Sequence, residues 1–75
     1  MALRYFNVYG PRQNPVGVHP GGVTIVINQL RDEGRSEVLG DGKQTRDMIF
    51  VGDIVQANVC AMEMPGTLNG RAFNI

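Results

Sequence analysis

The residues best suited to chemistry in this chain lie together in the stretch TRDMIFVGDIVQAN, residues 45–58. Arg46 and Asp47 come directly before the apolar run at residues 48–51, and a second acid, Asp53, follows it. A guanidinium donates paired hydrogen bonds to phosphate oxygens and does not lose its charge, so Arg46 is a candidate anion-binding side chain. The alternative is an exposed arginine paired with Asp47, which is the common arrangement for a surface charge pair.

The two aspartates are predicted to support Arg46 and the neighbouring helix. Asp53 is expected to cap a helix, with Gln56 three residues later completing a capping box. Asp47 is expected to hold Arg46 or the adjoining backbone. Cys60, within the predicted helix, is expected to be a small buried hydrophobic residue.

Apolar patterns and turn residues divide the chain into short elements around this stretch. We predict strands at residues 2–6, 36–39, 48–51 and 71–75, and helices at residues 23–33 and 53–64. In the first helix the apolar residues recur at one-turn spacing and Gly34 follows its end, although the β-branched run VTIVI would also suit a strand. The first and last strands are candidates for a parallel pair, which makes the predicted fold class α/β.

Length and charge exclude several classes of protein. Seventy-five residues allow one domain, and a single cysteine allows no internal disulfide. Cys60 and His19 are too few for a structural zinc site, so no metal is expected. Seven basic residues balance seven acidic ones, which argues against nucleic acid or an anionic membrane as the partner. With no long apolar run and no signal-like N-terminus, a soluble cytoplasmic protein is expected.

Four separated motifs resemble one enzyme family. ALRYFNVYGPRQNP, GDGKQTRD and IFVGDIVQAN, in this order and followed by GRAFNI, resemble the extended short-chain dehydrogenase/reductase family, in particular its NAD-dependent sugar-nucleotide epimerases and dehydratases. The resemblance implies a partial Rossmann-like fold. Its parts are the last two parallel core strands, together with the helices and short strands of the substrate-binding crossover.

The resemblance also implies a division of labour. The family's glycine-rich turn for the dinucleotide and its Tyr-x-x-x-Lys pair do not occur in these 75 residues. We therefore expect residues 1–75 to be a single partial domain that binds a UDP-sugar and is inactive alone. NAD would serve the full family enzyme and is not expected to bind this chain by itself.

The family's binding residues can be carried over to matching positions. Arg46 would bind the diphosphate of the sugar nucleotide, and Asn7 would hydrogen-bond its phosphate or sugar. The remaining contacts implied by the resemblance are Glu37, Val38 and Leu39 along the uracil, Val23 and Thr24 at the start of the first helix, and Phe6 beside the nicotinamide end of the cofactor. Turn chemistry for Asn7 and core packing for Phe6 are the alternatives. Arg12 and Gln13 lie in a family-like turn and receive no role, and His19 is expected to be exposed.

Two other hypotheses remain open. The chain could be a non-catalytic module that binds nucleotides or proteins, with an exposed strand edge covered by self-association, as in a homodimer. It could also be a partial gene product without a function of its own. Binding of UDP that depends on Arg46 would favour the UDP-sugar-binding partial domain over both of these hypotheses.

Overall fold

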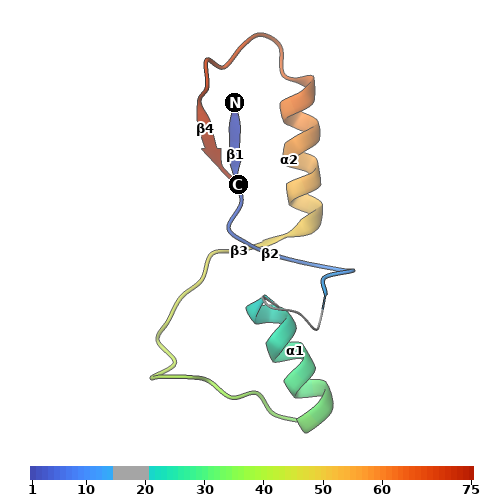
Figure 1. The fold of residues 1–75 in the computed structure, drawn as a ribbon, viewed down its shortest axis with the longest axis vertical. Coiled ribbons are helices and arrows are strands. Elements are labelled where there is room, and N and C mark those ends of the chain that lie inside the picture. The colour runs from blue at the N-terminus through green and yellow to red at the C-terminus, as the bar shows by residue number, and fades with distance from the viewer. Residues whose placement is uncertain (15–20) are drawn as a thin grey trace.

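The computed structural model describes residues 1–14 and 21–75. Along the chain its elements are β1 (Ala2–Arg4), β2 (Asn7–Tyr9), α1 (Gly22–Glu33), β3 (Met48–Phe50), α2 (Val51–Glu63) and β4 (Ala72–Asn74). Figure 1 shows α2 beside β1 and β4 in one half of the molecule, α1 in the other half, and β2 and β3 between them. The α/β prediction is confirmed.

The first and last strands form a parallel pair, as predicted. Leu3 of β1 lies opposite Phe73 of β4 in this two-stranded sheet. The ladder is extended at both ends, because the Ala2 amide donates to the Arg71 carbonyl at 2.9 Å and the Ile75 amide donates to the Arg4 carbonyl at 3.0 Å. Both termini therefore lie at this ladder (Figure 1).

A second parallel pair joins β2 to β3, and β2 was not predicted. The sequence interpretation ended the first strand at Asn7 and assigned the following residues to a loop. In the structure Asn7 instead begins β2, and Val8 lies opposite Ile49. The reason is long-range pairing: the Asn7 amide donates to the Asp47 carbonyl at 3.2 Å, directly before β3. A three-residue strand next to Gly10 and Pro11 carries no periodicity that would reveal it.

Helix α1 agrees with its prediction, but the strand predicted after it is absent. Gly34 adopts the left-handed conformation at φ 72°, and its amide donates to the Leu30 carbonyl at 3.0 Å. Residues 36–39 form no strand. The physical reason is Gln29 of α1, whose Oε1 accepts from Ser36 Oγ at 2.7 Å and from the Glu37 amide at 3.4 Å. The Gln29 side chain thus accepts from the Glu37 amide, a backbone donor that a strand at residues 36–39 would use to pair with a neighbouring strand.

Helix α2 begins earlier than predicted, and two expectations about it are wrong. Phe50 is the N-cap residue and makes no side-chain capping bond, so Asp53 does not form the predicted capping box. Asp53 lies in the first turn, where its negative charge favours the positive end of the helix dipole. Cys60 is exposed rather than buried, because it lines an open hollow that α2 shares with Leu3 of β1 and Phe73 of β4.

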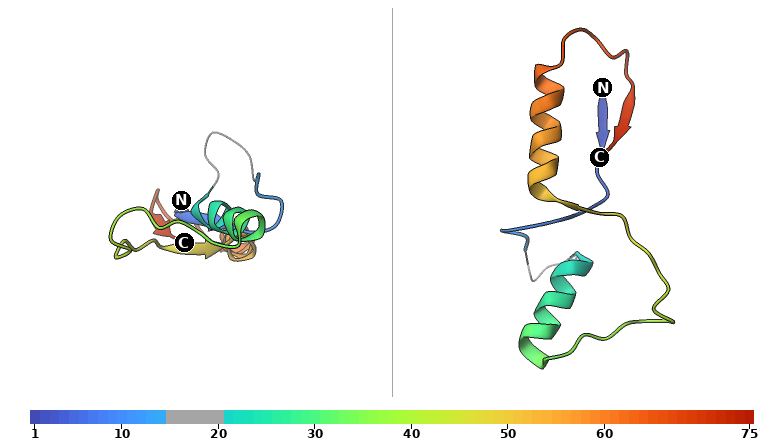
Figure 2. Two further views of the ribbon diagram at one scale, coloured as in Figure 1. Left: turned by 90° about the horizontal axis from the view of Figure 1, so that it is seen from below. Right: turned by 180° about the vertical axis from the view of Figure 1, so that it is seen from behind.

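The interior is small for a chain of this length. Ile54 of α2, with 8% of its surface exposed, is the one buried hydrophobic residue in the described part of the chain. Tyr5 and Asn58 connect β1 to α2, with Tyr5 Oη donating to Asn58 Oδ1 at 2.9 Å. The surface area of 6285 Å² exceeds the roughly 4,500 Å² of a compact protein of this mass. Figure 2, from behind, shows the same open arrangement of two halves.

The described residues contain neither a candidate membrane-spanning helix nor a candidate metal-binding group. Neither helix is long and apolar enough to cross a membrane. No group of three His, Cys, Asp or Glu residues in residues 1–14 and 21–75 is placed to hold a metal ion. His19 lies outside the described residues.

Candidate functional site

A hollow lies where β2, the approach to β3 and the start of α1 meet. Its volume is about 240 Å³, and the residues that line it are Asn7, Val8, Tyr9, Gln13, Gly21, Gly22, Val23, Arg46 and Met48. We call it the Arg46 hollow. Parallel pairing of β2 with β3 builds it, because that pairing sets Asn7 opposite Met48 and so brings residue 46 beside the first half of the chain.

Among the described residues that line the Arg46 hollow, Arg46 is the only charged one. Its Nη1 donates to the Thr45 carbonyl at 3.2 Å. Arg46 is exposed, as the alternative interpretation expected, but the ion pairs among the described residues do not include Arg46 with Asp47. A guanidinium has five N–H donors, and one bond to a neighbouring carbonyl leaves others for an anion.

Asn7 fastens the segment that carries Arg46. Its side-chain Nδ2 donates to the Asp47 carbonyl at 3.0 Å, and its own backbone amide donates to the same oxygen at 3.2 Å. Asp47 therefore supports the site through its backbone carbonyl, a contact that differs from the two predicted for Asp47, with Arg46 and with the adjoining backbone. Asn7 and Arg46 line one hollow, as the resemblance implied for two residues that bind one ligand.

The start of α1 forms another wall of the Arg46 hollow. Gly21, Gly22 and Val23 line it, and the first turn of α1 contains no acidic residue. The first amides of a helix have no partner within it and carry a positive partial charge. This wall therefore adds positive potential to the charge of Arg46. Thr24 does not line the Arg46 hollow. Its Oγ1 donates to Gln13 Oε1 at 2.8 Å.

The three residues predicted along the uracil lie outside the Arg46 hollow. Glu37 lines a separate hollow of about 430 Å³ with Gln29, Glu33, Arg35 and Ser36. Val38 and Leu39 are exposed by 62% and 77%. Residues 37–39 thus form an open surface that no other element of the described chain covers.

Phe6 is the one residue that the resemblance assigns to the cofactor. It is 46% exposed and lies between β1 and β2. The polar groups beside it are engaged, since Tyr5 bonds Asn58 and Asn7 bonds Asp47. The exposed ring is compatible with the place beside a nicotinamide that the resemblance implies for Phe6.

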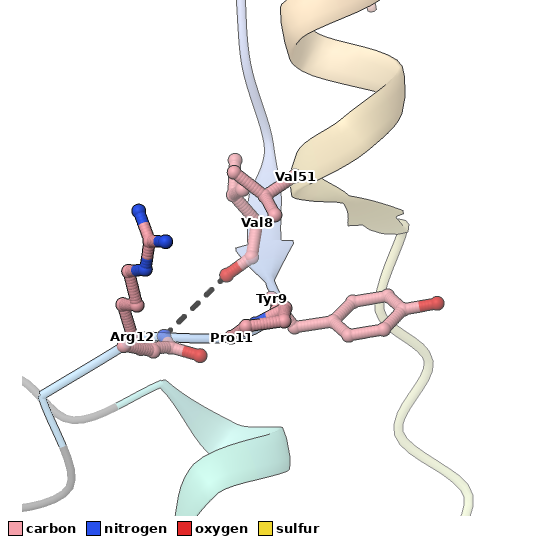
Figure 3. A pocket seen from close by; sticks show the side chains of 7 residues that line it. Val8, Tyr9, Pro11, Arg12 and Val51 are labelled. Atoms are coloured by element: carbon pink, nitrogen blue, oxygen red, sulfur yellow. Dashed lines mark hydrogen bonds between the residues drawn. The ribbon is translucent and has the colours of Figure 1, made fainter.

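Sequence reasoning left Gln13 and Arg12 without a role. In the structure Gln13 lines the Arg46 hollow, and Arg12 lies next to Gln13 in the adjoining turn. With Gly10, Pro11 and Val51 they line an adjoining hollow of about 310 Å³. Figure 3 shows the Arg12 side chain and the Tyr9 ring leaving this turn in different directions, with Val8 and Val51 side by side above it. The Gly-Pro-Arg-Gln sequence is a turn signal, since proline favours the second position of a four-residue turn.

The charged run at residues 31–33 lies at the other end of α1 and is exposed. Arg31 Nε lies 2.9 Å from Asp32 Oδ1. The hydrogen bond from Arg31 lowers the pKa of Asp32. These side chains do not line the Arg46 hollow and take no part in the site.

Comparison with known proteins gives a consistent result. A model of the NAD dependent epimerase/dehydratase family matches residues 1–75. A putative UDP-glucose 4-epimerase of Methanocaldococcus jannaschii is 45% identical over 60 residues, which is 80% of this chain and 19% of that protein. The UDP-glucose 4-epimerase of Mycolicibacterium smegmatis is 43% identical over 70 residues, covering 92% of this chain and 21% of that protein.

A solved structure shows the same fold. The crystal structure of UDP-glucose 4-epimerase with UDP-glucose, from the hyperthermophile Thermotoga maritima, superposes with a TM-score of 0.75 at 43% identity. The match covers 97% of this chain and 22% of that one. The expected partial Rossmann-like fold is therefore confirmed. The chain spans about a fifth of the length of these relatives.

Proposed function

This chain belongs to the NAD dependent epimerase/dehydratase family, and from that premise we propose that it forms the sugar-nucleotide-binding part of a UDP-sugar epimerase. The observation that carries the proposal is the Arg46 hollow, in which Arg46, Asn7 and the start of α1 come together from three separate segments. The names of the relatives and the UDP-glucose in the Thermotoga maritima structure support UDP-sugars as the ligand class.

The dimensions of the Arg46 hollow favour the diphosphate as the group that binds there. Its volume of about 240 Å³ is smaller than the ~300–1,000 Å³ of sites that enclose a whole small ligand. One guanidinium and the positive end of a helix suit an anion. The sugar and the uracil would extend beyond the hollow, with residues 37–39 as the surface proposed for the uracil.

The role proposed for this chain is binding and orientation. When bound to the whole enzyme, NAD would supply the hydride transfer of the family reaction. The residues of this chain hold the sugar nucleotide in place, and we expect the isolated chain to show no turnover of UDP-glucose. Phe6 is proposed to border the cofactor only within the whole enzyme.

A ligand series tests the proposal. In isothermal titration of the full chain, UDP and UDP-glucose are expected to bind, and uridine is expected to bind at least about 10-fold more weakly because it lacks the charge-assisted bonds to phosphate. Added salt should weaken the binding of UDP, since the Arg46 side chain is exposed and its charge is screened. Equal affinity for uridine and UDP, or no binding of UDP, would contradict the proposal.

Self-association is a second candidate, favoured by the apolar surface. Val55, Val59 and Met62 of α2 are 58%, 40% and 84% exposed. The chain exposes roughly 1,800 Å² more than a compact protein of its mass, whereas a standard interface covers about 800 Å² on each partner.

Sedimentation velocity over a range of concentrations checks this second candidate. We expect a homodimer that covers the open edge of the β1–β4 ladder, because an unpaired strand edge offers free backbone donors and acceptors. Met62 does not line the Arg46 hollow. Replacing it by a charged residue should shift the monomer–dimer equilibrium toward the monomer. A monomer at every concentration would rule out self-association.

A further inference from the structure

Gln13 connects two elements that form the Arg46 hollow. Its Oε1 accepts from Thr24 Oγ1 in the first turn of α1 at 2.8 Å. Its Nε2 donates to the Val8 carbonyl of β2 at 3.5 Å, a long bond. One neutral side chain therefore joins the strand that carries Asn7 to the helix that carries Val23.

Residues 10–13 form a turn, and after this turn the Gln13 side chain reaches α1. The Gln13 amide donates to the Gly10 carbonyl at 3.4 Å across Pro11 and Arg12. Arg12 has φ 69°, a left-handed conformation that is unfavourable for a residue with a Cβ. An unfavourable conformation persists only where the surrounding structure holds it, and the bonds of Gln13 lie directly after it.

The start of α1 has no capping side chain of its own. Its N-cap residue is Gly21, which makes no side-chain capping bond. A Cβ at Gly21 would lie 2.5 Å from Gln13 Nε2, so the amide of Gln13 fills the space that another residue would need there. Among the described residues, the bond between Gln13 and Thr24 is thus a side-chain tie on a helix start that is otherwise held by backbone bonds.

We propose that Gln13 is a positioning residue for the nucleotide diphosphate: it holds the first turn of α1 where that turn and Arg46 can bind the same phosphate groups. This inference rests on the proposed function of the Arg46 hollow. Gln13 carries no charge, and its effect is exerted through Thr24 and the amides at the start of α1.

A double-mutant cycle tests the tie from both of its ends. Gln13→Ala removes the acceptor, and Thr24→Val removes the donor with almost no change in shape. Each is expected to weaken UDP binding by roughly 3- to 10-fold, the effect of losing one neutral hydrogen bond. The double variant should be no weaker than either single one, and Thr24→Ser should retain the affinity of the unmodified chain. Additive losses would show that Thr24 acts independently, and would overturn the proposal.

Amide hydrogen exchange provides a readout that needs no ligand. The Ile25 amide donates to the Gly21 carbonyl at 3.1 Å, the first backbone bond of α1. Gln13→Ala and Thr24→Val should speed exchange at Ile25 and leave α2 unchanged, because a local opening is made easier only at the start of α1. Unchanged exchange at Ile25 in both variants would overturn the positioning role even if UDP binds normally.

Two glycine variants separate displacement of Gln13 from other effects. Gly21→Ala should reproduce the faster exchange and weaker UDP binding, because its methyl group displaces the Gln13 amide. For exchange, Gly22→Ala is the matched control, since its Cβ would meet nothing within 4 Å. For UDP binding the control is Gln29→Ala, because Gln29 bonds Ser36 near the other end of α1 and does not line the Arg46 hollow. If the unmodified chain does not bind UDP, the proposed function fails and the ligand role of Gln13 fails with it. If UDP binds and Gln13→Ala has the affinity of the unmodified chain, only the role of Gln13 is overturned.

Discussion

Arg46→Ala is expected to weaken the binding of UDP by roughly 10- to 100-fold, the effect of losing a hydrogen bond to a charged group. The reason is local: Arg46 is the only charged residue lining the Arg46 hollow in the described chain, so no other side chain there replaces it. Isothermal titration at low salt measures the effect. The helical content should stay the same, because the one side-chain hydrogen bond that Arg46 makes to the described residues is to the Thr45 carbonyl next to it.

Two further arginine variants define what Arg46 contributes. Arg46→Lys keeps the charge but loses the planar fork of donors, so an intermediate affinity is expected. Arg31→Ala is the matched control, because Arg31 is an exposed arginine paired with Asp32, does not line the Arg46 hollow and should leave UDP binding unchanged. The proposal would be refuted if Arg46→Ala bound UDP like the unmodified chain. It would also be refuted if Arg31→Ala lost as much affinity.

Gly10→Ala is expected to lower the free energy of unfolding so far that most molecules are unfolded. Gly10 has φ 153°, and an added Cβ would meet Val51 Cγ1 as well as Val51 Cβ at 3.1 Å. Overpacking costs about 1–3 kcal/mol, and the unfavourable backbone conformation adds about 1–2 kcal/mol. A domain of this length is stable by only about 4–11 kcal/mol, and a chain with one buried residue among those described belongs at the low end. Urea titration followed by circular dichroism measures the loss.

Two glycines serve as graded controls for Gly10. Gly66 has φ 83° with nothing within 4 Å of an added Cβ, so Gly66→Ala isolates the cost of the backbone conformation. Gly22, in the first turn of α1, has neither problem, and alanine there should be neutral or stabilising. The expected order of stability is Gly22→Ala, then Gly66→Ala, then Gly10→Ala. Equal losses for the last two would show that contact with Val51 is not what matters.

Local signals predicted some elements of this fold well. The apolar spacing from Val23 onward gave α1, and Gly34 marked its end because a left-handed residue there favours glycine. Elements that depend on distant partners were harder. Strand β2 exists because β3 pairs with it, and the strand predicted at residues 36–39 is absent because Gln29 takes its backbone donor. Asp53 had the right residue type for a cap but lies within the first turn of α2.

The candidate site was predictable only in part for the same reason. Residue type and resemblance singled out Arg46 and Asn7, and the structure lines one hollow with both. Neither source indicated that the Asp47 carbonyl holds Asn7, or that Gln13 bonds Thr24. Bonds between a side chain and a distant backbone or hydroxyl group leave no periodic pattern in a sequence.

The nested arrangement of the two strand pairs sets an order in which they can form. β1 and β4 join residues 70 apart, from Ala2 to Ala72, and closing so long a loop first is entropically costly. Once β2 has found β3, only residues 5 and 6 separate β1 from that pair, and α2 with a short connection leads to β4. We therefore expect β2 and β3 to pair before β1 and β4 do, since closing the shorter loop costs less entropy. In that order, the part of the chain that builds the Arg46 hollow would be assembled before β1 meets β4.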